Sequence, residues 1–111
     1  MSNEYTSAEP SRADIDATRG LMVLEFGDAY CSICAAARPA IETAMRTRPE
    51  VKHLKIADGR GRPLGRSFGI KLWPTLVFLQ DGREVTRLVR PMDDQPIAMA
   101  LQSLRADVAP A

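Results

Sequence analysis

Apolar residues gather in two continuous runs, which predict the central strands of a sheet. The runs cover residues 21–26 and 75–79, and each contains a single polar residue. A strand with one face in water alternates polar and apolar residues, so unbroken runs are typical of strands buried on both faces. Residues 51–57 do alternate, which predicts a third strand.

Turn and helix signals complete the order of elements. Asp81-Gly82 is a strong signal for a tight turn, so residues 84–89 are expected to return antiparallel to 75–79. The remaining segments have helical patterns: a short helix after the capping box of Ser11 and Asp14 and before Gly20, a helix from about Cys31 through Pro39 to Met45, a short helix over residues 64–68, and a final helix with residues 97, 98, 101 and 104 on one face. The predicted order is helix, strand, helix, strand, helix, strand, strand, helix.

The length of the chain favours a single domain. A chain of 111 residues can bury a core that needs neither a metal nor a structural disulfide. Residues 1–10 are polar and are expected to form a flexible segment, so that residues 11–107 make up the domain.

Charge and hydropathy narrow the classes of partner. The net charge is +1, and the sequence contains no motif that reads RNA or DNA, so we expect no nucleic-acid partner. No apolar stretch reaches the length of a membrane span. The N-terminus lacks the basic start and apolar core of a secretory signal. The expectation is a cytoplasmic monomer without a membrane partner.

Cys31 and Cys34 are the only two cysteines, and they stand at a predicted strand-to-helix junction. A close pair in a cytosolic protein is more often catalytic than structural. A disulfide across so short a loop would add only about 2 kcal/mol of stability in the chain-entropy model. Zinc needs four ligands, and the one histidine, His53, lies on another predicted strand, so only a metal shared between two copies stays open. We interpret His53 as a surface or packing residue.

Between Leu21 and Leu104 the chain resembles the thioredoxin family. Features of the family occur in the right order: Glu25-Phe26 at the end of a buried strand, Cys-X-X-Cys, Pro39 five residues after the second cysteine, Pro74-Thr75 before the next apolar strand, and Asp81-Gly82. The resemblance implies a thioredoxin-like α/β fold, with a central mixed β-sheet of about four strands flanked by helices. It also implies that Pro74 is a cis-proline facing the active site.

The departures from the family pattern surround the cysteines. They are Ser32-Ile33 in place of Gly-Pro, Tyr30 in place of tryptophan, Gly27 in place of a second aromatic residue, Glu25 in place of a buried aspartate, Trp73 in place of the usual isoleucine before the cis-proline, and Arg90 in place of a glycine of the substrate groove. The chemistry is therefore expected to be retained on an altered binding surface.

Each cysteine receives a different expected role. Cys31 lies at a helix N-terminus, where unpaired N–H groups favour a thiolate, and is the predicted nucleophile. Cys34, one turn deeper, is the resolving thiol. The resemblance implies that Glu25 accepts the proton of Cys34, and burial in an apolar strand is expected to raise the pKa of Glu25 toward neutrality.

Six residues around the cysteines are expected to contact the substrate. They are Tyr30, Ser32, Ile33, Trp73, Pro74 and Arg90. For Arg90, a solvated side chain at a strand end is an equal alternative to the selection of acidic substrates.

The sequence and the resemblance together predict a thiol–disulfide oxidoreductase that reduces protein disulfides by a Cys31/Cys34 dithiol–disulfide cycle. No bound cofactor or metal is expected, and NADPH would act indirectly, through a flavin-dependent thioredoxin reductase. Two alternatives stay open. One is a client-binding or co-chaperone module with a non-catalytic or regulatory cysteine pair, and the other is a disulfide oxidase or isomerase.

Overall fold

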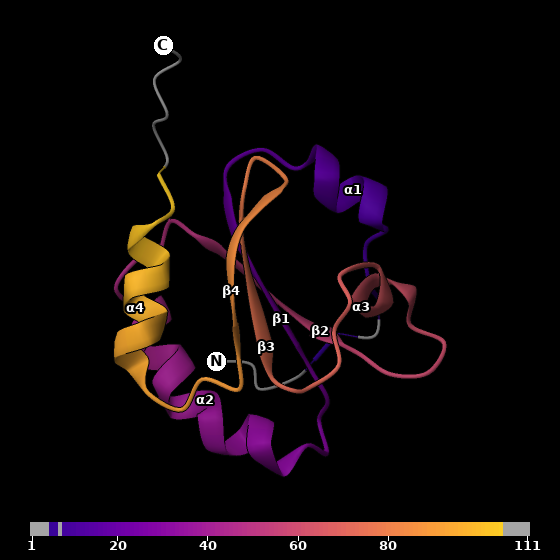
Figure 1. Cartoon of the computed structure of the whole chain (residues 1–111), viewed down its shortest axis with the longest axis horizontal. Helices are drawn as coiled ribbons and strands as arrows, with labels where there is room; N and C mark the ends of the chain where they lie inside the picture. Colours follow the sequence, from indigo (N-terminus) through magenta and orange to yellow (C-terminus); the bar gives the residue numbers. More distant parts are fainter. Residues whose placement is uncertain (1–4, 7, 106–111) are drawn as a thin grey trace.

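The computed structural model describes residues 5, 6 and 8–105, which form one four-stranded sheet with helices on both faces (Figure 1). The strand order is β2-β1-β3-β4, with β1 parallel to β2 and antiparallel to β3. The elements are α1 (Arg12–Ala17), β1 (Leu21–Gly27), α2 (Ser32–Met45), β2 (Lys52–Ala57), α3 (Pro63–Ser67), β3 (Thr75–Gln80), β4 (Arg83–Val89) and α4 (Asp94–Gln102). The predicted order of elements and the mixed α/β fold are confirmed.

The central strands are buried because each face of the sheet packs against its own pair of helices. Leu21 and Val23 of β1 join a cluster with α2 and α4, whereas Met22, Leu24 and Phe26 join a cluster with α1 and α3. Figure 1 shows these two layers on opposite sides of the sheet. A strand covered on both faces has no need of polar alternation, which explains the continuous apolar run.

Thr6 is attached to the edge of the sheet, although it belongs to the segment 1–10 that was expected to be flexible; residues 1–4 and 7 lie outside the described residues. Thr6 lies beside β2 in a parallel bridge: its N–H donates to the carbonyl of Lys55 at 2.8 Å, and its carbonyl accepts from the N–H of Ala57 at 3.0 Å. An edge strand offers unpaired backbone groups, and here Thr6 of the same chain pairs with them. The predicted domain boundary at residue 107 lies outside the described residues.

Helix ends follow the predicted signals only in part. The capping box of Ser11 and Asp14 is present, whereas Asp93 stands at the N-cap of α4 without a side-chain capping bond. The helix α2 runs through Pro39. Among the described residues, no helix is both long enough and apolar enough to span a membrane.

Gly82 is expected to tolerate no side chain. Its φ is +81°, and a Cβ built on it would lie 2.1 Å from the carbonyl oxygen of Asp16. Gly61 is a matched control, because its φ is +78° and its Cβ would meet no atom within 4 Å. We expect Gly61→Ala to lower the free energy of unfolding by about 1 kcal/mol and Gly82→Ala by about 3 kcal/mol, measured by urea denaturation. Equal losses would mean that the contact with Asp16 has no energetic weight.

Candidate active site

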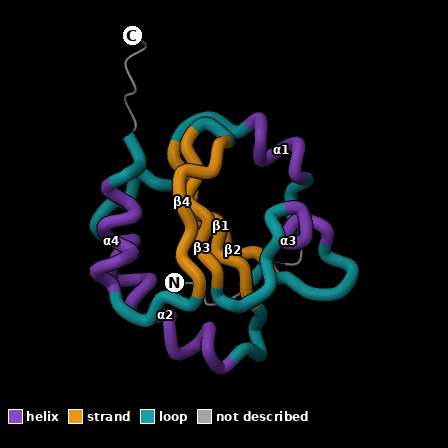
Figure 2. The backbone as a smooth tube through the Cα atoms, in the orientation of Figure 1, coloured by secondary structure: helices purple, strands orange, loops and turns teal. Residues whose placement is uncertain are grey.

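The lower end of the sheet in Figure 2 brings together the connections that leave β1 and enter β3. Phe26 pairs with Thr75, and Thr75 pairs with Val89, so Pro74 and Arg90 lie at the same end of the sheet as Gly27. The N–H of Asp58 donates to the carbonyl of Gly27 at 2.8 Å and fixes the end of β2 there as well.

The loop between β1 and α2 is shaped by Asp28. Its carboxylate accepts from the N–H of Tyr30 at 3.1 Å, and its carbonyl accepts from the N–H of Cys31 at 3.2 Å. This turn makes Cys31 the N-cap of α2, and the Cys31 sulfur accepts a hydrogen bond from the N–H of Cys34 at 3.1 Å. A thiolate at this position is stabilised by the helix N-terminus.

The two thiols differ in exposure, and the environment of Cys34 makes that thiol a weak acid. Both cysteines are unjoined thiols; Cys31 is half-buried, and Cys34 is only 3% exposed. Burial, followed by the hydrogen bond with Cys31, raises the pKa of Cys34 to about 11. Cys34 therefore stays protonated at neutral pH until a base takes its proton.

Alkylation is expected to distinguish the two thiols. At pH 8 a thiol with a pKa of about 11 is ionised in roughly one molecule in a thousand, so brief treatment with iodoacetamide should label Cys31 alone. Peptide mass mapping measures the labelled position, and the Cys34→Ser variant should label at the same rate. Comparable labelling of Cys34 in the unmodified chain would contradict this assignment.

Glu25 is the buried charged group of the site, and its pKa shifts against the prediction. The side chain is 2% exposed; it accepts a hydrogen bond from the Tyr5 hydroxyl at 2.5 Å and pairs with Nε2 of His53 at 2.8 Å. Burial raises its pKa, but the hydrogen bonds from His53 and Tyr5, together with the nearby charges of His53 and Lys55, outweigh burial and hold the pKa below its ordinary value. The predicted rise of the Glu25 pKa is wrong, because burial is opposed by these hydrogen bonds and charges from other segments of the chain.

Two partners of Glu25 were missed from the sequence. The interpretation of His53 as a surface or packing residue is wrong, since its ring pairs with Glu25. Glu25 pairs with Lys55 and Val23 with His53 in the parallel ladder, so all four side chains lie on the face covered by α2. The alternation of residues 51–57 already indicated that His53 and Lys55 share one face of this strand. Tyr5 had no comparable signal.

The segment before β3 joins Trp73, Pro74 and Arg90. The Trp73–Pro74 peptide is cis. The indole N–H of Trp73 donates to a carboxylate oxygen of Asp58 at 2.9 Å. Arg90 has a φ of +53°; its N–H donates to the Pro74 carbonyl at 2.7 Å, and its Nε donates to the Trp73 carbonyl at 2.9 Å. The Arg90 guanidinium thus lies against the cis peptide rather than standing free at a strand end.

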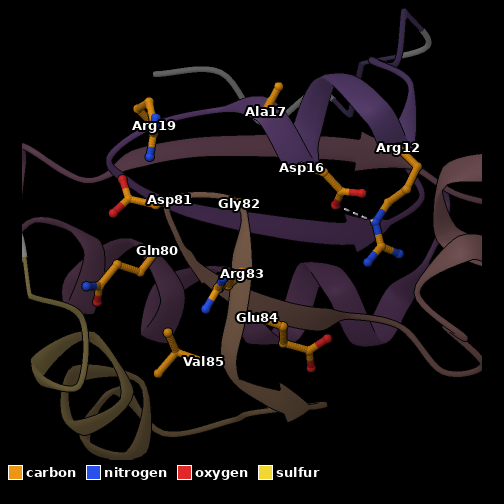
Figure 3. A pocket seen from close by; sticks show the side chains of 10 residues that line it. All are labelled: Arg12, Asp16, Ala17, Arg19, Gln80, Asp81, Gly82, Arg83, Glu84 and Val85. Atoms are coloured by element: carbon orange, nitrogen blue, oxygen red, sulfur yellow. Dashed lines mark hydrogen bonds and ion pairs between the residues drawn. The ribbon is translucent and has the colours of Figure 1, made fainter.

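The remaining candidates for substrate contact lie on the cysteine loop. Tyr30 is 95% exposed, Ser32 is exposed, and Ile33 is half-buried. A pocket of about 1140 Å³ lies elsewhere, at the opposite end of β1 between α1 and the β3–β4 turn (Figure 3). It is lined by charged side chains such as the Arg12–Asp16 pair and contains neither cysteine. Across residues 5, 6 and 8–105, no group of three or more His, Cys, Asp or Glu residues could hold a metal ion.

Comparisons with known proteins agree with this geometry. The family model described as Thioredoxin matches residues 4–103. Thioredoxin 2 from Pseudomonas aeruginosa, solved in its reduced form, superposes with a TM-score of 0.84 and 47% identity, over 93% of this chain and 95% of that one.

Curated relatives match a shorter stretch. A thioredoxin from Chlamydia muridarum is 35% identical over 71 residues, which is 63% of this chain and 69% of that protein. Thioredoxin H-type 1 from Nicotiana tabacum is 29% identical over 72 residues, which is 65% of this chain and 57% of that protein. The alignment therefore spans less than two thirds of the tobacco protein.

Proposed function

Because the chain belongs to the thioredoxin family, we propose that it is a thiol–disulfide oxidoreductase that reduces protein disulfides through Cys31 and Cys34. The observation that carries this proposal is the unequal pair: a more accessible thiol at a helix N-terminus, and one turn deeper a buried thiol with a pKa of about 11. The first can attack a disulfide, and the second is kept unreactive until it is needed.

The cycle has two exchange steps. The Cys31 thiolate attacks one sulfur of a client disulfide, forms a mixed disulfide and releases the first client thiolate. Cys34 then loses its proton, attacks the Cys31 sulfur and releases the second client thiolate. The client gains two electrons, and the enzyme keeps a Cys31–Cys34 disulfide. Glu25 is the proposed proton acceptor. Because its pKa is lower than the ordinary value, Glu25 is too weak a base to ionise Cys34 in advance, and the proton moves as the new S–S bond forms.

Client contact is assigned to the surface around Cys31. The exposure of Tyr30 and Ser32, the half-buried Ile33, and the place of Trp73 and Pro74 at the same sheet end support this assignment. Arg90 has one nitrogen bonded to the Trp73 carbonyl, so its proposed role is first to hold the cis-peptide segment.

Recycling requires an external reductant. We propose a flavin-dependent reductase that draws on NADPH, and a reducing compartment such as the cytoplasm, with the chain acting as a monomer. Cysteine use supports the compartment, because the sequence holds no cysteine beyond the redox pair.

A redox titration of the cysteine pair tests the proposed function. Trp73 is the only tryptophan, and its fluorescence can follow the Cys31–Cys34 disulfide in glutathione or dithiothreitol buffers. A midpoint near about −270 mV is expected for a reductase, whereas about −120 to −180 mV would indicate an oxidase or isomerase. If thiol trapping detects no disulfide over this range, the chain is a binding module and the proposed function fails.

A further inference from the structure

Tyr5 lies between the two groups that exchange a proton in the proposed cycle. Its hydroxyl donates to Glu25 at 2.5 Å. A Cβ built on Gly27 would lie 2.7 Å from the Tyr5 hydroxyl oxygen and 2.8 Å from the Cys34 sulfur. Both atoms therefore border the small space that a side chain at position 27 would occupy. The phenol is therefore bonded to the buried carboxylate and lies beside the resolving thiol.

The phenol is held from three sides. The neighbouring Thr6 is paired with the backbone of β2, which fixes the segment. The ammonium group of Lys55 lies 4.9 Å from the centroid of the Tyr5 ring, a cation–π distance. Gly27 leaves room for the ring, where the family pattern has an aromatic side chain of its own. The active site thus takes its aromatic residue from the N-terminal segment.

We propose that Tyr5 is a catalytic residue that passes the Cys34 proton to Glu25. This inference rests on the proposed function. As Cys34 attacks the mixed disulfide, its S–H proton moves to the Tyr5 oxygen, and the Tyr5 O–H proton moves to Oε2 of Glu25. Tyrosine is a neutral phenol before and after, Glu25 becomes a carboxylic acid, and the Cys34 sulfur forms the bond to Cys31. The leaving client thiolate takes up a proton from water.

The carboxyl group has a route by which to lose the proton afterwards. Its other oxygen, Oε1, bonds His53, whose side chain is 23% exposed. The charged and titratable groups that face Glu25 are Tyr5 from the N-terminal segment and His53 and Lys55 from β2. A pocket of about 270 Å³ beside Glu25 is also lined by Arg38 and Glu42 of α2 and by Arg46 at its C-cap. His53 is a positioning residue in this arrangement, because it touches Glu25 and not the sulfurs.

The Tyr5→Phe variant keeps the ring and removes only the hydroxyl. The probe is 5,5′-dithiobis(2-nitrobenzoate), which releases one coloured thiolate when Cys31 attacks and a second when Cys34 resolves the mixed disulfide. We expect the second phase, followed by stopped flow at pH 7, to slow about tenfold, because water must replace the phenol. The first phase should change less than about twofold, since Cys31 attack does not use Tyr5.

The pH profile separates a proton carrier from a structural role. In the unmodified chain the second phase should vary little between pH 6 and 8. In Tyr5→Phe it should rise steeply, by up to about tenfold per pH unit, because solvent base must ionise a thiol whose pKa is far above this range. A slower second phase with an unchanged profile would overturn the carrier role and leave Tyr5 structural.

The remaining outcomes keep the two proposals distinguishable. If the unmodified chain forms the Cys31–Cys34 disulfide and Tyr5→Phe does so at the same rate, the inference about Tyr5 fails and the proposed function stands. If the unmodified chain shows no second phase at all, the proposed function itself fails. Urea denaturation of Tyr5→Phe shows whether the variant is folded, and Tyr5→Trp, which keeps a large ring without a phenol, provides a second test of the pH profile.

Discussion

Replacing Cys31 by serine is expected to abolish disulfide reduction, with a loss of more than about a thousandfold. A serine hydroxyl does not ionise near neutral pH, and the remaining thiol, Cys34, is only 3% exposed. Its pKa of about 11 keeps it protonated as well. The measurement is the reduction of insulin disulfides by dithiothreitol, with the uncatalysed reaction as the baseline.

Cys34→Ser is the matched control for this experiment. It removes the second thiol but keeps the nucleophile, so we expect a client to accumulate as a mixed disulfide on Cys31, visible by mass spectrometry. If Cys31→Ser kept its turnover while Cys34→Ser lost it, the roles of the two cysteines would have to be exchanged. If Cys31→Ser bound a client as tightly as before and neither variant altered any turnover, the binding-module alternative would be favoured.

Glu25→Gln is expected to slow resolution of the mixed disulfide by about a hundredfold while leaving the attack by Cys31 nearly unchanged. Glutamine has the size of glutamate and can still accept a hydrogen bond from Tyr5, but it cannot take a proton. The two phases of thiolate release measure the two steps separately. An equal loss in both phases would point to a general disturbance of the fold rather than to proton transfer.

The same variant should change how stability depends on pH. The pKa of Glu25 is lower in the folded chain than its ordinary value of 4.5. A depressed carboxyl pKa stabilises the fold above about pH 4.5, and this contribution is lost as the pH falls through the folded value. Glu25→Gln should therefore show a shallower decrease of the free energy of unfolding on acidification. Glu50→Gln is an exposed control. A hydrogen bond to its own backbone and the pair with Arg48 also lower the pKa of Glu50, but solvent screens this fully exposed group, so the slope should change little.

The sheet could be predicted because its signals are local. Residues 21–26 and 75–79 carry their burial in their own composition, and Asp81-Gly82 forms the predicted turn, with φ values of +52° and +81°. The cysteine loop was predictable for the same reason, since Cys31 and Cys34 share one helical turn. These elements depend on neighbours in the chain and on few distant contacts.

The electrostatics of the site could not be predicted, because they depend on distant pairs. Tyr5 and His53 are 20 and 28 residues away from Glu25 in the sequence. Their hydrogen bonds reverse the shift that burial alone would give. The polar composition of residues 1–10 predicted a flexible segment, and no local pattern indicated that Thr6 would pair with β2.

At Arg90 the departure from the family pattern has a structural role that the sequence did not predict. The family pattern has a glycine here, and the structure gives the backbone reason: φ is +53°, a conformation that glycine adopts without strain. Arg90 adopts this backbone conformation, and its Nε donates a hydrogen bond to the Trp73 carbonyl. A departure that looked like a change of binding surface is thus also a tie between β4 and the cis-peptide segment.

The attachment of residues 5 and 6 to the edge of β2 has a practical consequence. Two backbone hydrogen bonds hold Thr6 there, and neither apolar cluster of the core includes a residue before Ile15. A protease that cut between residues 6 and 11 would remove the phenol without opening the core. Such a cleavage would therefore give a folded enzyme with slower turnover.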